Sequence, residues 1–218
     1  MAAGGQRFQR DEIEFGRVVA FSDGIFGIAM TLLVAGITVP RVAQGDLAQA
    51  LLDDIDDIVA FAVSFAVIGF YWLAHHSFFH LLSHIDHVLL RINLAYLGLI
   101  AFMPFPTALL GASDTSATAV ALYALALATA SGVEALMFRH ARRTGALRVP
   151  MPDGVYRDYL KASTAPVVVF LVSIPVAFVQ PAVAVLLWIA IFVVERLIDR
   201  TLSPETRAWA QRAMGAEE

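Results

Sequence analysis

The chain has 218 residues, of which 59% are hydrophobic and 16% charged, and its mean hydropathy is +0.71. Soluble domains are about 45–50% apolar and about 25% charged, so this composition excludes a soluble protein and indicates a membrane protein. The formal net charge of −4 argues against nucleic acid as a partner, and the lack of cysteine excludes disulfides, thiolate metal sites and thiol catalysis.

Six apolar segments approach the length that a membrane-spanning helix needs, which is about 20 residues. In chain order they cover residues 18–39, 55–73, 92–110, 117–138, 162–179 and 182–197. The arginine-rich and proline-rich stretch 139–161 is the longest predicted loop. We therefore predict an all-α, six-helix transmembrane domain over residues 1–200, followed by a cytoplasmic tail over 201–218 that is able to form an amphipathic helix.

The arginines predict the orientation of these helices. Every basic residue except Arg41 falls on one side of the predicted bundle. The positive-inside rule then places both termini in the cytoplasm. The opposite side is acidic, with Asp46, Asp53, Asp54, Asp56, Asp57 and Asp114. These carboxylates form either a solvated outer loop or a vestibule that attracts cations.

The first apolar segment carries polar residues near its start. Ser22 and Asp23 lie inside it, and Arg17 directly precedes it. A carboxylate at the centre of a membrane costs about 2.5–3.5 kcal/mol on insertion scales, so Asp23 needs a partner or water. Arg17 and the histidine and tryptophan groups of the second segment are the candidate partners. Asp23 either clamps helices together or takes part in ion passage.

Beyond Asp23, four residues share one helix face because they recur at i, i+3, i+4 and i+7: Ile28, Thr31, Leu32 and Ala35. Gly24 and Gly27 precede them and permit close approach between helices. Taken alone, this stripe is typical of ordinary helix packing, and pore lining is the second interpretation.

Residues 17–23 contain the motif R-x-x-x-F-S-D, formed by Arg17, Phe21, Ser22 and Asp23. This motif and its continuation to Val34 resemble the signature of the transmembrane protein 175 family, the lysosomal and prokaryotic potassium channels. The resemblance extends to residues 71–76, to Asn93 and to residues 102–107. It covers the first three predicted helices, whereas the last three agree only in length and hydropathy.

The resemblance implies a homotetrameric, potassium-permeable cation channel in the plasma membrane of a prokaryote, in which the first helix of each subunit lines a central pore. Ile28 would form a hydrophobic constriction, Leu32 and Ala35 further layers, and Thr31 a nearby hydroxyl. A polar network behind the pore would comprise Arg17, Phe21, Ser22, Asp23, Trp72, His75 and His76. Potassium is then the permeant ion, and the resemblance implies neither a cofactor nor a bound metal.

The chain contains no Thr-Val-Gly-Tyr-Gly loop, so a carbonyl cage cannot select potassium. A ring of isoleucines closes by dewetting, and when dilated it strips part of the hydration shell, which favours potassium modestly. Weak selectivity and a leak-like conductance are therefore expected.

One alternative function is a proton channel of the same architecture, in which Asp23 and histidines relay the protons. Another is a secondary transporter, although inverted repeats are not evident. Nucleophile-elbow, P-loop and H-E-x-x-H motifs are absent, which argues against an enzyme.

Five of the six histidines fall between His75 and His87. His76, His80 and His84 have i, i+4, i+8 spacing, which predicts that they share one face at the cytoplasmic end of the second helix. They are polar residues at the membrane exit, groups that make the channel pH-dependent, or ligands of a divalent metal. The first of these interpretations is preferred.

Prolines interrupt two of the predicted spans. Pro104 and Pro106 fall in the third, and Pro166 and Pro175 in the fifth. Each pair indicates a static bend or a gating hinge. Glu134, in the cytoplasmic half of the fourth span, is expected to pair with an arginine or to reach the interface.

Overall fold

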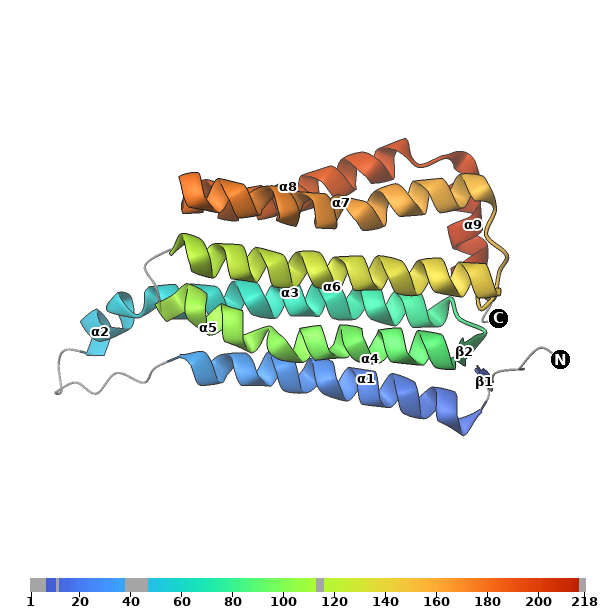
Figure 1. Ribbon diagram of the computed structural model, residues 1–218, viewed down its shortest axis with the longest axis horizontal. Helices are drawn as coiled ribbons and strands as arrows, with labels where there is room; N and C mark the ends of the chain where they lie inside the picture. Colours follow the sequence, from blue (N-terminus) through green and yellow to red (C-terminus); the bar gives the residue numbers. More distant parts are fainter. Residues whose placement is uncertain (1–6, 11, 38–46, 113–115, 216–218) are drawn as a thin grey trace.

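The computed structural model describes residues 7–10, 12–37, 47–112 and 116–215 (Figure 1). In chain order the elements are β1 (Arg7–Gln9), α1 (Ile13–Leu32), the 3₁₀ helix η1 (Leu33–Gly36), α2 (Leu47–Asp53), α3 (Ile55–His80), β2 (His84–Asp86), α4 (His87–Phe102), α5 (Pro104–Ala112), α6 (Ala117–Thr144), α7 (Asp153–Val179), α8 (Pro181–Thr201) and α9 (Pro204–Met214). Among the described residues, five stretches are long and apolar enough to cross a membrane: Ile13–Gly36, Ile55–His80, His87–Ala112, Ala117–Thr144 and Asp153–Val179. The predicted helical membrane protein is therefore confirmed.

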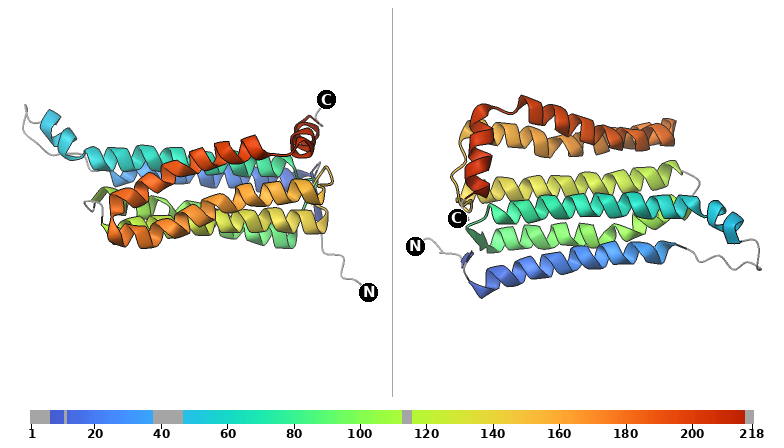
Figure 2. Two further views of the ribbon diagram at one scale, coloured as in Figure 1. Left: turned by 90° about the horizontal axis from the view of Figure 1, so that it is seen from above. Right: turned by 180° about the vertical axis from the view of Figure 1, so that it is seen from behind.

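The long helices run side by side along the longest axis of the molecule (Figures 1 and 2). α1 lies at one edge and packs against α3 and α4, and α8 lies at the other edge and packs mainly against α7. α6 connects the two halves because it packs against both α4 and α7. β1, β2 and α9 lie at one end of the bundle, and α2 lies at the opposite end.

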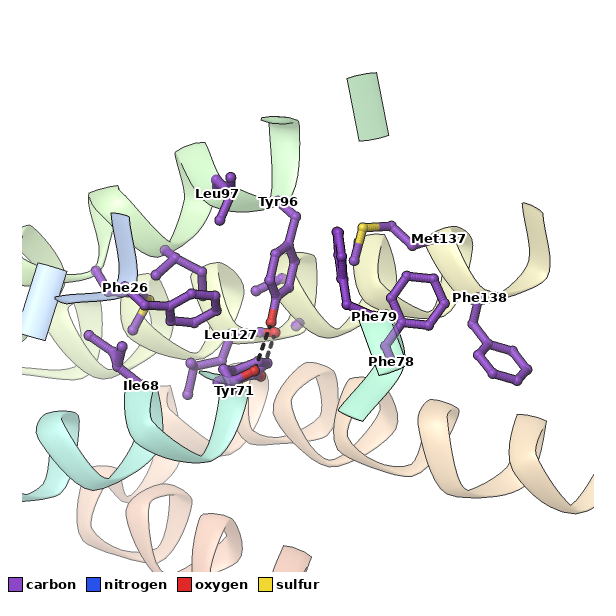
Figure 3. Packing of buried hydrophobic residues seen from close by; sticks show 14 of the residues in the cluster. Phe26, Ile68, Tyr71, Phe78, Phe79, Tyr96, Leu97, Leu127, Met137 and Phe138 are labelled. Carbon is purple, nitrogen blue, oxygen red and sulfur yellow. Dashed lines mark hydrogen bonds between the residues drawn. The ribbon is translucent and has the colours of Figure 1, made fainter. Parts of the chain in front are cut away.

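The core is aromatic and its hydroxyl groups are paired. Tyr96, from α4, is fully buried, and its hydroxyl donates to the backbone oxygen of Tyr71 (3.5 Å). The hydroxyl of Tyr71 donates in turn to the backbone oxygen of Leu127 on α6 (3.2 Å; Figure 3). Because no water is available inside a bilayer, such pairing is what makes buried hydroxyls acceptable there. α3, α4 and α6 are joined at this point.

The third predicted span is broken, whereas the fifth is not. α4 ends at Phe102 and α5 begins at Pro104, because the two prolines of this region have no N–H to donate. The backbone N–H of Met103 donates to the carbonyl oxygen of Ile100 (3.1 Å), to which Pro104 cannot donate, and so satisfies one acceptor at the break. Pro166 and Pro175, by contrast, lie inside one continuous α7 and do not end that helix, so the bend or hinge predicted there stays a prediction.

Most of the predicted loop 139–161 is helical. α6 continues to Thr144 and α7 begins at Asp153, so the loop prediction is wrong except for the residues between them. Gly145 ends α6 in the left-handed conformation, with φ of 69°, which glycine adopts at little cost. The arginines of this stretch indicate where the chain leaves the membrane, and helices continue past that boundary.

Three small elements were not expected. β1 pairs antiparallel with β2, with Phe8 opposite Ile85, and α2 precedes α3.

The tail contains the helix α9. Its N-cap is Ser203, whose hydroxyl accepts from the backbone N–H of Thr206. Trp209 of α9 donates its indole N–H to the carbonyl oxygen of Pro150 (3.1 Å). This contact fastens α9 to the connection between α6 and α7.

Asp86 joins three elements at this end of the bundle. Its carboxylate accepts from the backbone N–H of Leu89 (2.7 Å), which caps α4, and from Nε2 of His140 on α6 (2.8 Å). Burial opposes ionisation, but these two hydrogen bonds, together with the charge interaction with His140 and the backbone N–H of Val88, outweigh it and hold the pKa of Asp86 below its usual value. The charged carboxylate therefore stabilises the fold at neutral pH, and this contribution is lost as the pH falls through the lowered pKa.

Replacing Asp86 with alanine is expected to lower the free energy of unfolding by about 1–2 kcal/mol at pH 7, because the cap and the His140 contact are both lost. Asp86→Asn is the matched control, since asparagine also caps helices and should cost less. Thermal unfolding of the detergent-solubilised protein measures both. Equal losses for the two variants would show that the cap contributes nothing.

Candidate pore-lining helix

α1 has one covered and one uncovered face. Ser22, Phe26 and Ala29 of α1 are buried at spacings of four and three residues, which is one side of a helix, and Leu33 of η1 continues this spacing. This side packs against α3, α4 and α5. The arrangement follows from the sequence, because the buried residues are small or apolar where neighbouring helices approach.

The predicted stripe lies on the uncovered face. Ile28 is 57% exposed and Leu32 is 50% exposed, and Thr31 is exposed with its hydroxyl donating to the backbone oxygen of Ile28 (2.9 Å). A Cβ added at Gly24 or Gly27 would meet nothing within 4 Å. These glycines therefore do not serve packing within the subunit.

Ala35 does not continue the α-helical register of this stripe. It is exposed, but it lies in η1, since α1 ends at Leu32. A 3₁₀ helix has about three residues per turn, so side chains three residues apart point in the same direction. Ala35 therefore lies directly beyond Leu32 along the helix axis, whereas an α-helix would place it to one side. The layer after Leu32 is therefore built by a different kind of helix. Val39, the predicted end of the span, falls outside the described residues.

The partner of Asp23 is Trp72 on α3. The indole N–H of Trp72 donates to Oδ1 of Asp23 at 2.9 Å. The ring of Trp72 lies beside that of His76, with 5.4 Å between centroids, and Nε2 of His76 lies 3.0 Å from Nε2 of His80. Nη2 of Arg10 lies 3.4 Å from Nδ1 of His80, and because a guanidinium can only donate, Nδ1 is the acceptor in this contact. The proton of the His80 imidazole is then on Nε2, which donates to Nε2 of His76. A row of side chains thus connects Asp23 to the segment that precedes α1.

Ser22 belongs to a second, fully buried chain of hydrogen bonds. Nε2 of His75 donates to Oδ1 of Asn93 (2.8 Å), because an amide oxygen can only accept. Nδ2 of Asn93 donates to the hydroxyl of Ser22 (3.1 Å), which donates to the backbone oxygen of Val18 (2.9 Å). The imidazole of His75 also stacks on Tyr96, with centroids 5.5 Å apart. α1, α3 and α4 are thereby fixed to one another beside the uncovered stripe.

Arg17 and Phe21 are not part of either chain among the described residues. Both are exposed, and they line a cavity of about 410 Å³ between α1 and α4, with Glu14 and Asn93 also in its wall. Arg17 is therefore not the partner of Asp23 within the subunit. The roles that the resemblance implies for Arg17 and Phe21 stay predictions.

The predicted histidine face is wrong. α3 ends at His80, and His84 lies in β2, where it faces Gln9 of β1. The i, i+4, i+8 argument assumed a helix that continues through residues 81–83. Within the part of the chain that the structure describes, no three histidine, aspartate or glutamate residues are placed to hold a metal ion.

The acidic end of the molecule is described only in part. Asp54 precedes α3, and Asp56 and Asp57 lie in the first turn of that helix. A Cβ at Gly111 of α5 would lie 3.1 Å from Cα of Asp57, so this packing requires glycine. Arg41, Asp46 and Asp114 fall outside the described residues. The vestibule stays a prediction.

Sequence reasoning assigned no hydrogen-bond partner to Asn93 or Arg10, and it did not place Arg10 beside His80. For Asn93 the available signal was one amide in an otherwise apolar segment, which in a membrane needs a partner. Arg10 carried no comparable signal, because its position beside His80 depends on the pairing of β1 with β2.

Comparisons with known proteins place potassium channels among the relatives of this chain. The family model described as the endosomal/lysosomal potassium channel TMEM175 matches residues 17–104. A potassium channel of Streptomyces collinus is 39% identical over 145 residues, which are 64% of this chain and 70% of that protein. A potassium channel of Chamaesiphon minutus is 45% identical over 103 residues, 46% of this chain and 51% of that protein.

A solved structure extends the similarity beyond the first helices. The crystal structure of a lysosomal potassium-selective channel TMEM175 homologue from Chamaesiphon minutus has a TM-score of 0.70 and 31% identity, and the match covers 88% of this chain and all of that chain. Its coverage includes the segments for which the sequence offered only length and hydropathy. The chain therefore belongs to the TMEM175 family.

Proposed function

We propose that this protein is a potassium-permeable cation channel of a prokaryotic plasma membrane, a homotetramer in which α1 of each subunit lines a central pore. The observation that carries the proposal is the uncovered apolar face of α1 at the edge of the subunit, around Ile28 and Leu32. One subunit of this size cannot enclose a pore, so several copies must contribute that face. The bacterial relatives named potassium channels support the choice of ion.

α8 is the sixth span in this proposal. It covers Pro181–Thr201, is mostly apolar, and packs against α7. An even number of spans agrees with β1 and α9 lying at the same end of the bundle (Figure 1). That end also receives the arginine-rich end of α6, which the positive-inside rule assigns to the cytoplasm.

A ring of Ile28 side chains, one from each subunit, controls conduction in this proposal. Leu32 and Ala35 form further layers, and the Thr31 hydroxyl lies beside the constriction. Water leaves a narrow hydrophobic ring, which closes the pore to ions. When the ring dilates, an ion passes with part of its hydration shell removed, and potassium loses water more readily than sodium. Weak selectivity follows.

Hydrogen bonds behind α1 support this ring. Trp72 holds the carboxylate of Asp23, and Asn93 joins Ser22 to His75. Both contacts lie about one to two turns before Ile28 and fix α1 against α3 and α4. They hold the side chains of Ser22 and Asp23 against α3 and α4, so that neither polar group lies on the proposed pore face.

Recording from the purified protein in planar bilayers tests the function. With potassium and pH gradients imposed separately, the reversal potential should follow the potassium gradient and change little with the pH gradient. A reversal potential that follows protons would identify the proton channel instead. A saturating flux without channel openings would identify a transporter.

A further inference from the structure

Two cavities lie in the half of the molecule away from α1. The first, of about 340 Å³, lies between α3, α6, α7 and α8, and its walls are largely apolar, with Val67, Leu127 and Phe170 among them. The second, of about 460 Å³, lies between α3, α7 and α9, at the end of the bundle that carries α9. Both volumes fall in the range of about 300–1,000 Å³ that small-molecule sites occupy. The proposed conduction path uses neither cavity.

One face of α3 lines both cavities. Residues of α3 and its C-cap recur there at alternating spacings of four and three, which keeps them on one side of the helix: Val63, Val67, Phe70, Ala74, Ser77 and Leu81. The first four of them line the first cavity, and the last two line the second. Trp72 and Phe79, which contact Asp23 and Phe15 of α1, lie on the opposite side of α3. The two cavities therefore follow one another along the side of α3 that is turned away from α1.

α7 lies along the other side of the same path. Tyr159 and Ala162 of α7 line both cavities, so the two spaces adjoin at these residues. At a rise of 1.5 Å per residue, the path along α3 from Val63 to Leu81 is about 27 Å long. One leaflet of a bilayer, with its headgroups, is about 20 Å thick. The path is therefore long enough for one lipid molecule that lies parallel to the helices.

The first cavity suits a hydrocarbon chain. It reaches the outer surface of the bundle, where Val63 and Phe70 are 45% and 41% exposed, and in a membrane such an opening admits molecules from the lipid phase. The polar groups in its wall interact within the chain: the hydroxyls of Tyr71 and Ser131 lie 2.6 Å apart, and Glu134 is also engaged. An occupant therefore does not have to supply a polar partner here.

The second cavity suits a phosphate headgroup. Arg148 lines it, and a guanidinium has five N–H donors, so an interaction within the chain still leaves donors for a phosphate. The carboxylate of Asp158, also in the wall, accepts from the hydroxyl of Thr206 (2.7 Å) and lies 3.7 Å from Nζ of Lys161, which balances its charge. Trp209 lines the same cavity, and tryptophan is enriched at the headgroup level of membranes. Basic pockets between membrane helices at this level bind anionic headgroups.

We propose that the two cavities together form a binding site for one phospholipid, whose phosphate pairs with Arg148 and one of whose acyl chains fills the apolar cavity. The apolar walls favour burial of the chain. Arginine matches a phosphate through paired N–H groups, which gives the site a preference for a phospholipid over an uncharged lipid. In the proposed orientation this lipid belongs to the cytoplasmic leaflet, and it connects α9 to α3 and α7.

The test uses the full-length protein in detergent micelles with palmitoyl-oleoyl phosphatidylglycerol as probe, and the diacylglycerol with the same two chains as the probe without phosphate. Thermal unfolding at increasing lipid content gives a Kd, because a bound ligand stabilises the folded state. Phosphatidylglycerol should bind about fivefold tighter, the factor typical of one basic residue at an anionic headgroup. Arg148→Gln should remove this preference and leave binding of the diacylglycerol unchanged. Arg143→Gln, which exchanges an exposed arginine of α6 outside both cavities, should retain the preference.

A second variant keeps the test decisive if Arg148→Gln does not fold. Ala162→Phe places a ring where the two cavities adjoin and should weaken binding of both lipids, whereas Ala66→Phe, at an exposed position of α3 outside both cavities, should not. Equal affinity of the wild type for the two lipids, an unchanged preference in Arg148→Gln, or undiminished binding in Ala162→Phe would each overturn the proposal. The readout does not depend on ion conduction, so its failure is distinguishable from failure of the channel function.

Discussion

Ile28→Asn should raise the potassium current about tenfold, which corresponds to a lowering of the conduction barrier by about 1.4 kcal/mol. Ile28 is 57% exposed on the uncovered face of α1, so the substitution does not disturb the core of the subunit. An asparagine amide binds water and keeps the narrowest part of the pore wet, which removes the dewetting barrier. Single-channel or macroscopic recording in bilayers of matched protein density measures the change.

Leu171→Asn is the matched control for this substitution. Leu171 is 49% exposed on α7, in the half of the molecule away from α1. Leu171→Asn therefore also adds an amide to an exposed apolar position, but at a position that does not face the proposed pore. Its current should equal that of the wild type. If Ile28→Asn also leaves current and selectivity unchanged, Ile28 is not the constriction.

Asn93→Ala should lower the free energy of unfolding by about 2 kcal/mol, because it breaks two interhelical hydrogen bonds and opens a small cavity. Asn93 is only 2% exposed, and it accepts from His75 and donates to Ser22. Without it, the imidazole N–H of His75 has no acceptor at that position. Loss of the hydrogen bonds of Asn93 also loosens the attachment of α1 to α3 and α4. We therefore expect the single-channel current of the variant to vary more in amplitude.

Two further variants separate the network from general packing effects. Ser22→Ala removes one of the two bonds and should cost about half as much, roughly 1 kcal/mol. Leu94→Ala alters the neighbouring residue, which is 58% exposed, and should change stability by less than about 0.5 kcal/mol. Unfolding in detergent measures all three. A loss in Leu94→Ala as large as that in Asn93→Ala would contradict a specific role for the amide.

The membrane-spanning segments could be predicted from sequence, because a helix that crosses a bilayer needs about 20 mostly apolar residues in a row. The ends of the helices could not. α3 continues through His76 to His80, and α6 continues through Arg139 to Thr144. Polarity indicates where the membrane ends, whereas a helix ends where its backbone is capped, as Gly145 does for α6.

The pairing of β1 with β2 was also outside the reach of sequence reasoning. Phe8 and Ile85 are far apart along the chain, and three residues are too few for a recognisable alternation of polar and apolar positions. The error over His84 has the same origin, since its placement depends on this pairing. A helical spacing argument applies only while the helix continues.

For the site, sequence reasoning found the residues but not their partners. The cost of an intramembrane carboxylate indicated that Asp23 needs a mate, and Arg17, tryptophan and histidine were all open. Only the packing of α1 on α3, which brings together residues 49 positions apart, identifies Trp72. Helical periodicity alone grouped the stripe residues of α1 on one face, but it did not predict that this face is uncovered, and Ala35 departs from the stripe in η1.

Cysteine substitution tests whether the uncovered face of α1 lines the conduction path, as we propose. The chain contains no cysteine, so single-cysteine variants can be read without background labelling. Thr31→Cys and Leu32→Cys lie on the uncovered face, and Ala29→Cys, at a position that is 1% exposed, is the matched control on the covered face.

A positively charged methanethiosulfonate reagent applied during recording gives the most direct measurement. Modification of Thr31→Cys or Leu32→Cys should reduce the potassium current at once, whereas the current of Ala29→Cys should not change. Complete labelling of both exposed positions with no change in current would contradict it, because the path would then lie elsewhere in the protein.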